Sequence, residues 1–109
     1  MSTLFQTKII NNVGTAPTTA VTAPSNGTVT VLGLSLANLT NDNIYASVKV
    51  ADNLSNSAYY AYNLLVPPNS SLRVLNGGER LTLASQYSLT VSASEDNGFD
   101  AVISYVVIQ

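Results

Sequence analysis

The stretch that decides the fold of this chain runs Gly27-Thr28-Val29-Thr30-Val31-Leu32-Gly33-Leu34-Ser35-Leu36-Ala37-Asn38-Leu39-Thr40. Most of its residues are β-formers and its polar residues arrive singly, which predicts a central β-strand. Side chains on a strand alternate between two faces, so Val29 and Val31 share one face while Leu34 and Leu36 have the opposite parity. The apolar pattern therefore changes phase at Gly33, and we predict a β-bulge or a sharp bend there.

The rest of the chain repeats short apolar runs that are separated by turn residues. We predict further strands over 44–50, 58–66, 71–75, 80–84, 87–93 and 99–108. Asn76-Gly77 stands between two of these runs and is a hairpin signal. No stretch carries a helical period with caps. Seven or eight strands at turn intervals of about 8–12 residues predict an all-β fold, a single antiparallel β-sandwich of the jelly-roll or immunoglobulin-like type.

The first 26 residues differ in composition from the remainder. Residues 3–12 alternate loosely between apolar and polar, which predicts an edge strand or an arm that docks on a neighbour. Residues 13–26 are rich in Gly, Thr, Ala, Pro and Ser, and they predict an extended linker because proline fixes φ and cannot donate a ladder hydrogen bond. This linker is either a surface loop or an arm that crosses onto another subunit. We therefore divide the chain into an N-terminal arm and linker (1–26) and a β-sandwich domain (27–109).

Charge is scarce along this sequence. Of its 109 residues 9% are charged, and the formal net charge is -2. The few cations are scattered, which argues against binding to nucleic acid or to an acidic membrane surface. No run approaches the about 20 apolar residues of a membrane helix, and the first residues lack the pattern of a secretory signal. We expect the chain to stay where it is made, and its weak self-repulsion favours an assembly over a dilute monomer.

Reactive side chains are the next class to consider. The chain has no cysteine and no histidine, which excludes disulfides, thiol catalysis and a Ser-His-Asp triad. Glu95, Asp96 and Asp100 are close in sequence and offer oxygen ligands for Ca²⁺, but their spacing does not match an EF-hand loop, and a solvated acidic hairpin is the preferred interpretation. We predict no catalytic residue, no metal site and no cofactor, and we do not expect an enzyme.

Four tyrosines form the main aromatic group of the sequence. Tyr45, Tyr59, Tyr60 and Tyr62 offer rings on which sugars stack. They alternate between two faces of the predicted strands, and tryptophan is absent. Packing in the core and at its rim is therefore the preferred explanation of the tyrosines, and sugar binding is the alternative.

The last predicted strand is apolar on both of its faces. One face carries Phe99, Ala101, Ile103, Tyr105 and Val107, and the other face carries Val102, Val106 and Ile108. A second apolar face is typical either of a central strand that is covered on both sides or of a subunit interface. Apolar residues near the N-terminus offer the same kind of contact. The candidate interface residues are Leu4, Phe5, Ile9, Val102, Val106 and Ile108.

Several segments, taken in order, resemble small β-sandwich virion proteins of tailed bacteriophages, particularly phages that infect cyanobacteria and other marine bacteria. The resemblance spans roughly residues 27–109. Members of this group commonly have glycine at the position of Asn69 and a Gly-Asp pair at Ser85-Gln86, and both departures fall in predicted turns. The segments that carry the resemblance are Val31-Leu32-Gly33-Leu34-Ser35-Leu36-Ala37-Asn38-Leu39-Thr40, Val66-Pro67-Pro68-Asn69-Ser70-Ser71-Leu72, Val91-Ser92-Ala93-Ser94 and Val102-Ile103-Ser104-Tyr105-Val106.

This resemblance implies a structural component of a virion, made in the host cytoplasm and present in many copies. A capsid decoration or cement protein is the expected role, with further copies of the chain as partners, a trimer favoured, and other virion proteins such as the major capsid protein. A neck, tail or fibre protein is the alternative within the same class. From a different class, the alternative is a carbohydrate-binding adhesin module in which the tyrosines make the contacts.

Overall fold

The computed structural model describes residues 3–75 and 80–109, and these form nine strands and no helix. The all-β antiparallel sandwich is confirmed, with nine strands in place of seven or eight. In the described residues there is also no helix long and apolar enough to cross a membrane. The strands are β1 (Thr3–Val13), β2 (Thr18–Thr22), β3 (Thr28–Asn38), β4 (Ile44–Ala51), β5 (Ser57–Val66), β6 (Ser70–Leu75), β7 (Leu81–Leu83), β8 (Ser88–Ala93) and β9 (Phe99–Ile108).

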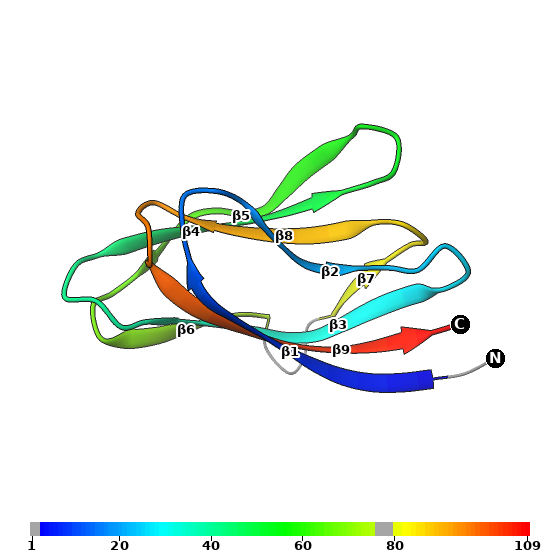
Figure 1. The fold of residues 1–109 in the computed structure, drawn as a ribbon, viewed down its shortest axis with the longest axis horizontal. Helices are drawn as coiled ribbons and strands as arrows, with labels where there is room; N and C mark the ends of the chain where they lie inside the picture. Colours follow the sequence, from blue (N-terminus) through cyan, green and yellow to red (C-terminus); the bar gives the residue numbers. More distant parts are fainter. Residues whose placement is uncertain (1–2, 76–79) are drawn as a thin grey trace.

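Two sheets face each other across the core (Figure 1). Sheet A has the order β1-β9-β3-β6, with β7 also paired to β3, and sheet B has the order β2-β8-β4-β5. Because β1 pairs with β9, β2 with β8, β3 with β6 and β7, and β4 with β5, the first half of the chain runs beside the second half as one long ribbon. This ribbon wraps across both sheets, so the sandwich is a jelly roll rather than an immunoglobulin-like fold.

β3 contains the predicted phase change. Its register with β9 shifts between Val31 and Gly33, which leaves Leu32 as the extra residue. In an uninterrupted strand the valines and leucines would face opposite ways, but the extra residue returns all of them to the core. The four buried side chains are Val29, Val31, Leu34 and Leu36.

Gly33 itself is not required at this bulge. A Cβ atom at Gly33 would meet no atom closer than the carbonyl oxygen of Leu75 at 4.0 Å, and no described glycine has a positive φ. We expect Gly33→Ala to change the free energy of unfolding by less than about 0.5 kcal/mol.

Gly98→Ala provides the comparison, because a Cβ there would lie 2.8 Å from the Cβ of Ala93 and 3.0 Å from the carbonyl oxygen of Glu95. We expect this substitution to lower the free energy of unfolding by about 1–3 kcal/mol. Urea unfolding of both variants measures the two changes. Equal losses of unfolding free energy would contradict the open space at Gly33 and the close contacts at Gly98.

Residues 3–22 contribute two strands to the sandwich, which differs from the expected arm and linker over 1–26. β1 pairs with β9, and β2 pairs with β8. Pro17 and Pro24 flank β2 and do not interrupt it, so its threonines and valine, which are β-branched, can pair. The core side chains from residues 3–26 are Ile10, Val13, Ala20, Val21 and Ala23.

The hairpin predicted at Asn76-Gly77 lies outside the described residues. The strands on either side of it, β6 and β7, pair in succession with β3, β6 along its second half and β7 along its first half. Both run antiparallel to β3 and therefore point in the same direction, so they do not form a hairpin with each other. The two strands lie one after the other along the same edge of β3, at one side of sheet A.

Asn69 occupies a turn position at which the resembling virion proteins commonly have glycine. Its φ is 54°, in the left-handed region that glycine favours. Asparagine enters this region more readily than other residues with a side chain. This departure from the resemblance therefore preserves the backbone shape of the turn between β5 and β6.

Candidate assembly surface

The outer face of sheet A, which points away from sheet B, carries five of the six predicted interface residues. The cross-strand pairs Phe5 with Val106 and Ile9 with Val102 place these side chains on one face of β1 and β9. Ala101 and Ile103, which alternate with them on β9, are buried in the core. We call this group the apolar stripe, and it consists of Phe5, Ile9, Val102, Val106 and Ile108.

Exposure differs along the apolar stripe. Phe5 is 72% exposed, Ile9 67% and Val102 40%, whereas Val106 is buried between Phe5 on β1 and Thr30 on β3. β9 is thus a central strand within its sheet, yet no further layer of described residues covers its outer face. These exposed apolar side chains lie on neighbouring strands and form a continuous patch rather than a scatter of single residues.

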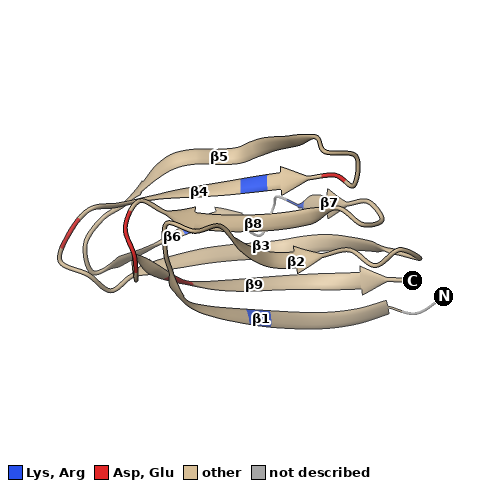
Figure 2. Ribbon diagram, turned by 45° about the horizontal axis from the view of Figure 1, so that its top comes forward, with Lys and Arg blue, Asp and Glu red and all other residues tan. Residues whose placement is uncertain are grey.

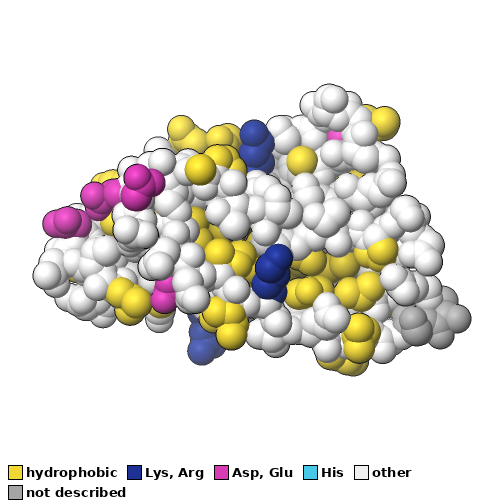
Figure 3. All heavy atoms as spheres, in the orientation of Figure 1, with side chains coloured by type: hydrophobic (Ala, Val, Ile, Leu, Met, Phe, Trp, Pro, Cys, Tyr) yellow, Lys and Arg dark blue, Asp and Glu magenta, His cyan; other side chains and the backbone are white. Residues whose placement is uncertain are grey.

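Leu4 does not share this face. It pairs with Val107, whose side chain packs against the core, so Leu4 points toward the inside at the rim of sheet A. It is 53% exposed there. Figure 3 shows hydrophobic side chains in a strip between the two sheets, with a Lys or Arg side chain lying over it. Its pairing with Val107 therefore places Leu4 at the inner rim of sheet A and not in the apolar stripe.

β1 leaves one edge of sheet A free. Its register with β9 is regular from Thr3 to Ile10, and this stretch contains one charge, Lys8, and no proline. β5, at the edge of sheet B, contains two register shifts along β4, which make its edge irregular. A long, regular and weakly charged edge can accept a further strand, whereas a bulged edge resists one. β1 is therefore the better edge for strand addition.

The acidic residues that offer oxygen ligands for Ca²⁺, and for which a solvated hairpin is the preferred interpretation, do not converge. Oδ1 of Asp96 accepts two hydrogen bonds from Thr15, one from the backbone nitrogen at 3.3 Å and one from the Thr15 Oγ1 at 3.1 Å. Oδ1 of Asp100 accepts one from the backbone nitrogen of Asn12 at 2.9 Å. In the described part of the chain, no three His, Cys, Asp or Glu side chains lie together as a metal site. Asp96 instead ties the β8–β9 turn to the β1–β2 turn, and Asp100 joins the start of β9 to the end of β1.

Asp52 organises the turn between β4 and β5. Its Oδ1 accepts hydrogen bonds from the backbone nitrogens of Leu54 at 2.8 Å and Asn56 at 3.0 Å, and its Oδ2 accepts one from Nδ2 of Asn56 at 3.1 Å. These bonds, the one from Leu54 first, hold the pKa of Asp52 below its ordinary value. The lowered pKa stabilises the fold above the unfolded pKa of Asp52, and this contribution is lost as the pH falls through the folded pKa.

An NMR titration of the Asp52 carboxyl carbon checks this arrangement. We expect a midpoint below that of an unfolded peptide with the same sequence, and Asn56→Ala should raise the midpoint because the Nδ2 donor is removed. A wild-type midpoint equal to that of the peptide would contradict the hydrogen-bonded turn.

The four tyrosines are exposed, between 39% and 63%, so the part of the prediction that places them in the core, rather than at its rim, is wrong. The rings of Tyr59 and Tyr62 meet edge to face, with centroids 4.7 Å apart and an interplanar angle of 61°. Nζ of Lys49 lies 5.5 Å from the centroid of the Tyr59 ring. The two extra residues of β5 break its alternation and bring these rings together.

Comparison with known proteins gives a likeness of fold. No family model matches the chain, and no curated protein matches it. A solved structure described as "Bacillus endospore appendages form a novel family of disulfide-linked pili" superposes with a TM-score of 0.56 and 7% identity. The match covers 97% of this chain and 86% of that one. The two chains share an architecture, and at this identity the likeness concerns the fold alone.

Proposed function

We propose that this chain is a non-enzymatic structural subunit that assembles with further copies of itself. The observation that carries the proposal is the apolar stripe beside the free edge of β1. A second copy can cover exposed Phe5 and Ile9 and can also pair its backbone with β1, so two kinds of contact act at one place. The low net charge of the chain opposes such an assembly only weakly.

The fold likeness to a pilus protein supports an assembled, structural role. That relative is described as disulfide-linked. The present chain contains no cysteine, so its subunits would associate without disulfide links. Apolar contacts, strand pairing and charge would then take the place of the disulfides in stabilising the assembly.

Within this class, a virion component is our finer proposal, and the sequence resemblance of residues 27–109 supports it. The favoured place is the capsid, as a decoration or cement protein that forms trimers and contacts the major capsid protein. Because β1 and β2 belong to the sandwich, bridging between capsomers would depend on the faces and edges of the sandwich rather than on a long arm. A neck, tail or fibre protein, or an appendage outside the cell, would use the same surfaces.

Sedimentation over a range of concentrations tests the assembly. We expect the wild type to self-associate, and the double variant Phe5→Thr/Ile9→Thr to weaken association at least about tenfold while it keeps the β-propensity of the strand. Leu54→Thr is the matched control, since Leu54 is equally exposed but lies in the β4–β5 turn. A wild type that remains monomeric at high concentration and does not bind purified shells would refute the proposal.

Carbohydrate binding is the second candidate, because the tyrosines are exposed. Tyr59, Tyr62 and Lys49 form a cluster on the outer face of sheet B near its β5 edge. A glycan array with the wild type and with Tyr59→Ala/Tyr62→Ala tests this candidate. Binding that the double variant loses would support it, and an array without any bound glycan would exclude it for the glycans presented.

A further inference from the structure

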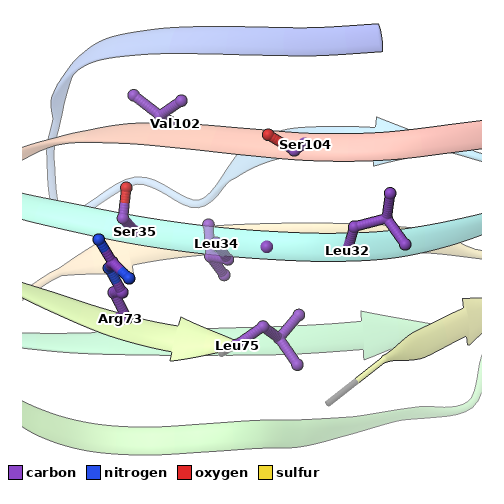
Figure 4. Close-up of a pocket in the computed structure, with 8 residues that line it drawn as sticks. Leu32, Leu34, Ser35, Arg73, Leu75, Val102 and Ser104 are labelled. Atoms are coloured by element: carbon purple, nitrogen blue, oxygen red, sulfur yellow. The ribbon is translucent and has the colours of Figure 1, made fainter. Parts of the chain in front are cut away.

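A shallow hollow lies on the outer face of sheet A, directly beside the apolar stripe. Its volume is about 200 Å³, and it lies over Gly33, where β3 carries no side chain. Val102 lines the hollow and also belongs to the stripe, so the two surfaces are continuous. Figure 4 shows the side chains around the hollow, which come from β3, β6 and β9 and include Leu32, Ser35, Arg73, Leu75 and Ser104.

Arg73 gives the hollow its charge. Its side chain reaches from β6 toward Ser35 on β3 (Figure 4), and it makes no hydrogen bond or ion pair with a residue that the structure describes. A guanidinium presents a planar fork of N–H donors that matches a carboxylate, and the hydroxyls of Ser35 and Ser104 are further donors. The volume is below the roughly 300–1,000 Å³ of pockets for drug-sized ligands. The hollow therefore fits one carboxylate on a short apolar stem.

Most of the Asp and Glu residues that the structure describes lie at one end of the sandwich, whereas Asp52 lies at the other end (Figure 2). At the end that carries most of them, Asp96 and Asp100 already accept hydrogen bonds from the backbone nitrogens of Thr15 and Asn12. Glu95 is exposed in the β8–β9 turn and has no partner among the described residues. Leu39, which is 72% exposed, lies in the β3–β4 turn at the same end. This acidic end thus offers a free carboxylate together with an apolar side chain.

We propose that the hollow binds the Glu95 carboxylate from a second copy of this chain. The charges are complementary, the apolar walls of the hollow suit Leu39 or the stem of Glu95, and Val102 connects the site with the apolar stripe. The inference rests on the proposed function, since it requires that copies associate. The contact joins an end of one copy to a face of the next, and such an unlike pairing produces an open chain of subunits unless its rotation closes a ring.

Charge reversal tests the pairing in the full-length chain. Arg73→Glu and Glu95→Lys should each weaken self-association about tenfold or more at low salt, and the double variant Arg73→Glu/Glu95→Lys should restore it. Arg80→Glu is the matched control, because Arg80 is also exposed and lies outside the hollow. It should leave association unchanged, and Arg80→Glu/Glu95→Lys should not restore it. Thermal unfolding confirms that each variant is folded.

A second measurement separates this site from self-assembly as a whole. The ¹⁵N-labelled protein is titrated with a synthetic peptide of residues 93–99, and a peptide with Glu95→Gln serves as its control. Saturable shifts at the amides of Gly33, Ser35 and Ser104 that Arg73→Glu removes would support the site, even if the proposed assembly failed. Charge-reversed single variants that associate like the wild type, or peptide shifts that Arg73→Glu leaves in place, would overturn the inference.

Discussion

A chain that lacks residues 1–26 is expected not to fold. The deletion removes β1 and β2 and with them five buried side chains from the core. It also uncovers Leu89 and Val91 on β8 and one whole edge of β9. The lost burial is on the order of 5–10 kcal/mol, which is comparable to the whole stability of a typical domain. A ¹H–¹⁵N correlation spectrum should therefore collapse to the narrow dispersion of an unfolded chain.

Removal of residues 1–9 alone is the control for this deletion. Every described residue that it removes is exposed, and Ile10 and Val13 stay in place. We expect this shorter deletion to unfold cooperatively, at a lower temperature than the wild type, and to lose self-association because Phe5, Ile9 and most of the free edge are gone. A dispersed spectrum from the chain without residues 1–26 would contradict the jelly roll and restore the interpretation of this region as a separate arm.

The sequence predicts most strands because their local patterns are strong. The alternation in β4, β8 and β9 marks one buried face on each, and the structure confirms these faces. β2 escaped prediction because it is five residues long, lies between Pro17 and Pro24, and gains its partner β8 from far along the chain. The order of strands in the sheets depends on such distant pairings, which periodicity does not encode.

Some surface features are also predictable from the sequence, and others are not. Parity on β9 predicts that Val102, Val106 and Ile108 share a face, and the register with β1 shows which of the N-terminal residues join them. The pairing of the Tyr59 and Tyr62 rings and the hollow at Arg73 arise from extra residues in β5 and β3, together with their neighbours across the sheet. A bulge changes the facing of every later side chain, so a sequence pattern read as a regular strand assigns those residues to the wrong face.

Asn38 is a buried polar residue that the sequence pattern does not distinguish from its neighbours. Only 1% of it is exposed, at the end of β3. Its Nδ2 donates to the carbonyl oxygens of Asp42 at 2.8 Å and Val66 at 2.9 Å. Its Oδ1 accepts from the backbone nitrogen of Thr40 at 2.9 Å and from the Oγ1 of Thr40 at 2.7 Å. One side chain thus joins the end of β3, the β3–β4 turn and the end of β5.

Asn38→Ala is expected to lower the free energy of unfolding by about 2–4 kcal/mol, because it leaves several backbone groups in a poorly hydrated place without their partner. Asn11→Ala is the matched control, since Asn11 is exposed on β1, and it should cost less than about 0.5 kcal/mol. Urea unfolding measures both values. Hydrogen exchange should also quicken in residues 39–43, which carry Leu39 and part of the acidic end. Equal stability of the two variants would mean that the hydrogen bonds of Asn38 are replaced by water at little cost, and that the turn is held by its strands alone.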